Sequence, residues 1–169
     1  MSARGIEVTY GAKRHLFGPP GHGIKVLHGV DIDIRRGETV GIVGESGSGK
    51  TTLGRALLRL VDVSAGSIHF EGRDITHLPD SEMRPLRRRM QMIFQDPMAS
   101  LNPRHTIRRI LVEPLLLHGL ASDRKEAERR VAKILERVTL PQACLDRNPH
   151  ELSGGQRQMV GLARALYGD

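Results

Sequence analysis

The stretch Gly44-Glu45-Ser46-Gly47-Ser48-Gly49-Lys50-Thr51 decides the fold class of this 169-residue chain. It follows an apolar, β-branched run at 39–43 and precedes apolar residues with helical spacing. The pattern GxxxxGK[ST] between a strand and a helix predicts a phosphate-binding loop, because glycines let N–H groups turn inward and a helix N-terminus attracts anions. Lys50 is expected to reach the β- and γ-phosphates of a nucleotide, and the Thr51 hydroxyl to bind Mg²⁺. The predicted nucleotide-binding residues are Gly44, Glu45, Ser46, Gly47, Ser48, Gly49, Lys50, Thr51 and Thr52.

Strand and helix periods alternate on both sides of this loop, which predicts an α/β fold. Strands are expected at 6–10, 26–34, 39–43, 67–70 and 90–94. Helices are expected at 53–61, 79–89, 106–118, 124–138 and from 153 onward, the fourth with an Asp123 cap. Its buried stripe is predicted to be Ala127, Val131, Ile134, Leu135 and Val138.

A second motif opens the last predicted helix. Ser153-Gly154-Gly155-Gln156 follows His150-Glu151-Leu152 and places Ser and Gln at capping-box spacing. Two glycines in a first turn cost roughly 1 kcal/mol each relative to alanine. Glycines at these positions would let a ligand approach the backbone at the positively polarised N-terminus of the helix. The structural alternative is a helix cap that contains glycine and binds no ligand.

The phosphate loop together with the LSGGQ sequence at 152–156 resembles the ATP-binding subunit of ABC transporters, in which LSGGQ is the signature motif. The resemblance implies that Ser153, Gly154, Gly155 and Gln156 contact ATP held by the opposite subunit of a head-to-tail dimer, formed with an identical chain or a paralogue. It also implies that Gln95 touches Mg²⁺ or the attacking water. Tyr10 lies where the family places an aromatic ring on adenine; Phe17 and an ordinary strand aromatic are the alternatives.

The sequence FQDPMASLNPR at 94–104 is similar to the peptide and nickel importer subfamily. This resemblance implies a subunit that couples MgATP binding and hydrolysis to uptake of peptides or nickel. It implies integral-membrane permease partners and a peripheral position on the cytoplasmic face of the cell membrane. The implied architecture is a P-loop NTPase core with an N-terminal antiparallel β part at 1–96, a helical subdomain at 97–152 and the signature helix at 153–169.

Part of the family's catalytic equipment is not found among the 169 residues. Family members continue into a strand that ends in the Walker B aspartate and a catalytic glutamate, but no apolar run here ends in Asp-Glu, and Asp169 has no strand before it. The expected sheet is therefore incomplete at its C-terminal side. We expect weak ATP binding at best and negligible hydrolysis from this chain alone, and a truncated remnant is an alternative interpretation.

The charge of +7 leaves a nucleic-acid-associated ABC protein as a further alternative. The chain has few aromatic side chains that could stack on bases: two Tyr, three Phe and no Trp. No specific nucleic acid is therefore expected as a partner. The arginine-rich runs 84–89 and 104–109 are interpreted as solvated faces, with docking onto an acidic helix or anionic lipid as the second interpretation. The lone Cys144 excludes an internal disulfide.

Overall fold

Two compact units, Met1–Met90 and Gln91–Asp169, divide the chain in this computed structural model. The structure describes residues 1–11, 23–95 and 100–168. Phe17, the alternative adenine-stacking residue, lies outside the described residues, as does the terminal Asp169.

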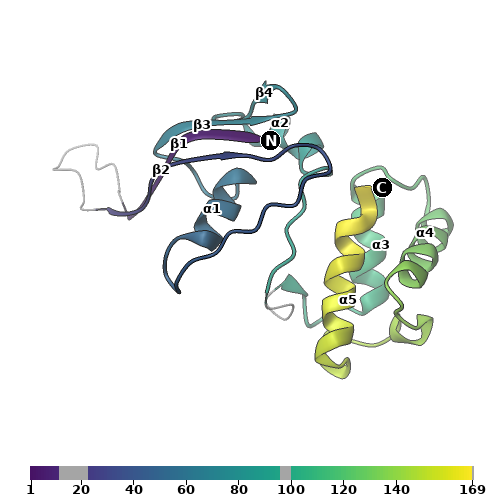
Figure 1. Ribbon diagram of the computed structural model, residues 1–169. Coiled ribbons are helices and arrows are strands. Elements are labelled where there is room, and N and C mark those ends of the chain that lie inside the picture. Colours follow the sequence, from purple (N-terminus) through teal and green to yellow (C-terminus); the bar gives the residue numbers. More distant parts are fainter. Residues whose placement is uncertain (12–22, 96–99, 169) are drawn as a thin grey trace, which may run out of the picture. The chain divides into compact units, whose positions relative to one another are not determined.

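The first unit is built on a four-stranded antiparallel sheet (Figure 1). The strands are β1 (Ser2–Tyr10), β2 (Ile24–Asp33), β3 (Ala65–Phe70) and β4 (Arg73–Asp74), in the order β2-β1-β3-β4. The predicted alternation in β1 is confirmed for Ile6 and Val8, which are buried while Glu7 and Thr9 are only partly buried; Tyr10, predicted on the same face, is exposed at the end of the strand. Helix α1 (Lys50–Leu57) lies against this sheet, and α2 (Asp80–Leu86) follows β4.

Helix α1 ends before the predicted residue 61. Its Leu53, Ala56 and Leu57 are buried in the core, as expected, but Leu60 is 47% exposed. The chain leaves the helix through Arg59, whose φ is 53°, while the Leu60 N–H donates to the Arg55 carbonyl. This left-handed cap satisfies the last carbonyls. The sequence does not predict this cap, because the residue with positive φ is an arginine and not a glycine.

Two of the predicted strands do not form. Residues 39–43 and 90–94 are irregular, and neither pairs with a strand among the described residues. Val43 is 96% exposed and Ile93 is 55% exposed. A β-branched, apolar sequence only favours extended backbone; a strand also needs a neighbour that accepts and donates its main-chain hydrogen bonds.

The second unit packs α3 (Ile107–Leu117), α4 (Arg124–Arg137) and α5 (Gly154–Ala165) around one apolar core. Short 3₁₀ turns lie at η2 (Gln142–Cys144), η3 (Pro149–Glu151) and η4 (Leu166–Gly168). The predicted stripe of α4 is confirmed, since its five residues are all buried. The Asp123 cap is confirmed too: its carboxylate accepts the Glu126 N–H at 2.8 Å. α5 belongs to this unit, where the Tyr167 hydroxyl donates to the Leu111 carbonyl at 2.6 Å.

Most arginines of the two basic runs form ion pairs with carboxylates of the same chain. Arg87 pairs with Asp80 at 2.8 Å, and Arg89 pairs with Glu71. In the second run, Arg108 pairs with Asp146 at 2.9 Å and Arg109 with Glu113 at 2.6 Å. These pairings favour the solvated-face interpretation over docking. In the part of the chain that the structure describes, no helix has the length and apolarity needed to cross a membrane.

Candidate functional site

The predicted phosphate-binding loop lies between the irregular run 39–43 and the N-terminus of α1. A turn closes it, in which the Ser48 N–H donates to the Glu45 carbonyl at 3.2 Å. Gly49 caps α1 with a φ of 91°, and a Cβ there would lie 2.9 Å from Leu27 Cδ2. Glycine is therefore required at this position by both backbone conformation and the close approach of β2. The loop therefore leads into α1 beside strand β2 of the sheet.

The Lys50 ammonium lies across this loop. Its Nζ donates to the carbonyls of Gly44 at 2.8 Å and Glu45 at 2.5 Å, and lies 3.4 Å from Ser48 Oγ. The first turn of α1 contains no acidic residue. The ammonium and the positive end of the helix therefore act together at an exposed loop, which is an arrangement suited to an anion.

The donor set at this loop fits the phosphates of a magnesium nucleotide. The first N–H groups of a helix have no intrahelical acceptor, so those of Lys50, Thr51 and Thr52 can point to phosphate oxygens. Thr51 is exposed, and its hydroxyl is a hard oxygen ligand of the kind that Mg²⁺ takes. The structure thus places the nine predicted binding residues, 44–52, in one continuous loop and helix start.

Tyr10 lies at the same end of the sheet as the loop. It is the last residue of β1, pairs with Ile24 of β2 and is 40% exposed. Val26, whose carbonyl would lie 3.3 Å from a Cβ at Gly49, is two residues, or about 7 Å, further along β2. This register is compatible with the predicted role of Tyr10 in stacking on adenine, which stays a prediction.

The signature residues begin α5 in the second unit. Ser153 Oγ accepts the Gln156 N–H at 3.2 Å, and the Gln156 side chain accepts the Ser153 N–H at 3.0 Å, which is the predicted capping box. Arg157 donates to the Leu152 carbonyl at 2.6 Å. The helix start is therefore held by its own side chains and does not need glycine for capping.

Gly154 and Gly155 have no structural reason to be glycine within the described residues. Both are exposed, neither has a positive φ, and a Cβ added at either would meet nothing within 4 Å.

We expect Gly155→Ala to raise the free energy of unfolding by about 0.5–1 kcal/mol, because alanine is the better helix former. Urea unfolding of the 169-residue chain measures this, with Gly119→Ala as control: its φ of 62° should make that change destabilising. A destabilised Gly155→Ala variant would mean that the glycine is structural.

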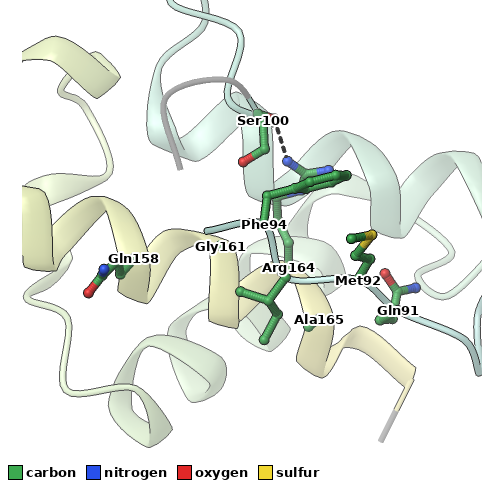
Figure 2. Close-up of a pocket in the computed structure, with 9 residues that line it drawn as sticks. Gln91, Met92, Phe94, Ser100, Gln158, Gly161, Arg164 and Ala165 are labelled. Atoms are coloured by element: carbon green, nitrogen blue, oxygen red, sulfur yellow. Dashed lines mark hydrogen bonds between the residues drawn. The ribbon is translucent and has the colours of Figure 1, made fainter. Parts of the chain in front are cut away.

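Gln95, which is predicted to touch Mg²⁺ or the attacking water, also lies in the second unit. It occupies an exposed bend directly after the irregular segment 91–94. That segment lines a cavity of about 40 Å³ together with α5 (Figure 2). Asp96, which follows it, is outside the described residues.

Arg164 is a further residue at this cavity, which the apolar periodicity of the sequence does not predict. Its guanidinium donates to the Ser100 carbonyl at 2.7 Å. The signal in the sequence is a second stripe on α5, Gln158, Gly161 and Arg164, spaced three residues apart.

A comparison with protein families matches residues 27–169 to the family described as ABC transporter. A Brucella ovis protein named for ATP binding in peptide import is 55% identical over 166 residues, covering 98% of this chain and 50% of that protein. An oligopeptide transport ATP-binding protein of Bacillus subtilis is 43% identical over 167 residues, with the same coverage of 98% and 50%. The chain thus spans about half the length of the curated relatives it matches.

Among solved structures, a dimeric ATP-binding cassette in a post-hydrolysis state, bound to ADP and Pi, superposes with a TM-score of 0.82. It is 29% identical, and the match covers 99% of this chain and 69% of that one. The expected fold class is therefore confirmed, with an antiparallel β part, a P-loop helix and a helical unit.

Proposed function

This chain belongs to the ABC transporter family, and on that premise we propose that it is the ATP-binding subunit of a peptide importer. The observation that carries the proposal is the phosphate loop, where the Lys50 ammonium and the N-terminus of α1 face the same exposed turn. The names of the relatives, which refer to peptide import and oligopeptide transport, support peptides over nickel as the transported class.

The proposed cofactors are ATP and Mg²⁺. Residues 44–52 would hold the phosphates, and Tyr10 would stack on adenine. Thr51 and Gln95 are the proposed magnesium ligands. The metal ion, when bound, neutralises phosphate charge and so favours attack at the γ-phosphate.

ATP hydrolysis by the 169-residue chain alone is proposed to be negligible. The sequence holds no apolar run that ends in Asp-Glu, so an acidic residue to orient the attacking water is not supplied by it. We expect isothermal titration to detect MgATP binding by the purified chain without phosphate release. Lys50-dependent turnover would contradict this proposal, and salt-sensitive RNA or DNA binding without ATP binding would favour the nucleic-acid alternative.

The proposed ATPase partner is a second cassette, identical or paralogous, in a head-to-tail dimer. The exposed Gly154 and Gly155 at the capped start of α5 leave the backbone open to a phosphate presented by that partner. The relative solved with ADP and Pi is itself dimeric.

The second unit also carries a groove suited to a permease subunit, which would place the chain on the cytoplasmic face of the cell membrane. The groove has a volume of about 540 Å³. Its apolar residues include Leu115, Ile134 and Leu166, and its cations include Arg129, Arg130 and Lys133.

Arg130 is held by Glu126, whose pKa is lowered to about 2 by hydrogen bonds from the Ser122 main chain and hydroxyl and from Arg130 itself. Arg129 and Lys133 have no ion-pair partner within the described ranges, so a permease segment with carboxylates and apolar side chains would complement the groove.

A charge reversal tests this docking surface. We expect Lys133→Glu to weaken retention on a detergent-solubilised peptide-importer permease at least tenfold, because close interfacial charge pairs are worth roughly 1.5–7 kcal/mol. Lys125→Glu, on the same helix but outside the groove lining, is the matched control. Equal retention of the two variants would rule out the groove as the docking surface.

A further inference from the structure

The groove of about 540 Å³ in the second unit has apolar walls. Leu115 and Ile134 come from α3 and α4, which pack against each other (Figure 1), and Leu166 and Tyr167 come from η4. The Tyr167 hydroxyl is already used, because it donates to the Leu111 carbonyl at 2.6 Å. It is therefore the ring of Tyr167 that is left for an apolar ligand.

The charged side chains that line the same groove have a net charge of +3 within the described residues. They are one carboxylate, that of Glu126, and four cations: Arg129, Arg130, Lys133 and Arg137. The carboxylate is fully used. Glu126 Oε2 accepts the Ser122 N–H and hydroxyl, both at 2.8 Å, and Oε1 accepts Arg130 Nε at 3.1 Å and Nη2 at 2.8 Å. Four donors fill the lone pairs of a carboxylate, so Glu126 cannot also bind the ammonium of a ligand.

Arg129 and Lys133 are the cations of this groove that a ligand can reach most directly. Both are exposed, and neither forms a hydrogen bond or an ion pair with any residue in the described ranges. They are four residues apart on α4, so they are neighbours on one helix face. Exposed cations beside apolar walls complement an anionic head on an apolar body. The volume lies in the range of small-molecule sites, roughly 300–1,000 Å³.

We infer that the groove binds a free amphiphilic anion, which is a small carboxylate with an aliphatic body. Its head lies between Arg129 and Lys133, and its body lies against Leu115, Ile134 and the Tyr167 ring. The occupied Glu126 selects against zwitterions and cations of the same shape. The consequence for regulation rests on the proposed function: the ligand occupies the surface assigned there to the permease, so it competes with permease docking.

Straight-chain carboxylates test the site in the 169-residue chain without any substitution. NMR of protein labelled at tyrosine follows Tyr167 in the groove, while Tyr10, in the other unit, is the internal control. We expect octanoate to shift the Tyr167 ring signals and to bind at least about fivefold more tightly than hexanoate, because each buried CH₂ is worth about a factor of four in affinity. Octanol and octylammonium should each bind at least about fivefold more weakly than octanoate.

Substitutions on α4 test the anionic head separately. Arg129→Met combined with Lys133→Met should weaken octanoate binding at least about fivefold, and Lys125→Met, outside the groove lining, should not. Far-UV circular dichroism confirms that each variant is folded. Equal affinity for octanoate and octylammonium, equal affinity of the double variant and the parent, or equal shifts at Tyr10 and Tyr167 would each overturn the inference. Binding to phosphatidylglycerol vesicles but not to octanoate would overturn it as well, because the ligand would then be a membrane lipid.

The competition is measured separately from the binding. Octanoate should lower retention of the chain on a peptide-importer permease in nanodiscs of uncharged lipid. If octanoate binds and retention is unchanged, the permease docks elsewhere, and that part of the proposed function fails while the anion site stands. If Lys133→Glu weakens retention but octanoate does not bind, the anion site is overturned and the docking surface stands.

Discussion

Lys50→Ala is expected to lower the affinity of the chain for MgATP by roughly tenfold to 150-fold. A hydrogen bond from a charged group contributes about 1.5–3 kcal/mol, and each 1.4 kcal/mol is a factor of ten. The ammonium already lies at the loop, where it donates to the Gly44 and Glu45 carbonyls, so it needs only a short movement to reach phosphate oxygens. Isothermal titration of the parent and the variant with MgATP measures the difference.

Two further variants sharpen this test. Lys125→Ala removes the same side chain from an exposed position on α4 and should leave the affinity unchanged. Lys50→Arg keeps the charge but replaces a compact ammonium with a planar fork, so it should also bind MgATP more weakly than the parent. Affinity that is insensitive to Lys50 would remove the main support for nucleotide binding at this loop.

Gly66→Ala is expected to destabilise the first unit by about 2–5 kcal/mol. Gly66 has a φ of 91°, and a Cβ there would lie 2.4 Å from the main-chain oxygens of both Arg4 and Gly5. The left-handed conformation costs roughly 1–2 kcal/mol for a residue with a Cβ, and the overlap with backbone adds about 1–3 kcal/mol. The β1–β3 register shifts between Arg4 and Glu7, so the bulge depends on this close approach.

Gly29→Ala is the matched control for that prediction. Gly29 has a similar φ of 81°, but a Cβ there would meet nothing within 4 Å. Its substitution should therefore cost only the conformational part, roughly 1–2 kcal/mol. Urea unfolding followed by circular dichroism compares the two. Equal losses would show that the contact with β1 is not what requires glycine at position 66.

The sequence predicted the parts of the candidate site that depend on local chemistry. The loop at 44–51 and the signature at 152–156 each lie within a few residues, so their spacing alone specifies a turn, a helix start and a capping box. The α4 stripe was equally predictable, because a helix face is fixed by a spacing of 3.6 residues. The interaction of Arg164 with Ser100 could not be predicted, since 64 residues separate the two and no period relates them.

Local pattern therefore determined where helices begin, which faces they bury and which loop can bind phosphate. Tertiary structure decided what depends on a neighbour. Residues 39–43 and 91–94 have strand-like sequences, yet stay irregular because no described strand supplies their main-chain hydrogen bonds. Helix α1 likewise ends at Leu57, where the Arg59 Nε donates to the Ile75 carbonyl at 3.0 Å and supports a left-handed backbone. A helix can be specified by its own hydrogen bonds, whereas a strand or a long-range contact requires its partner in place.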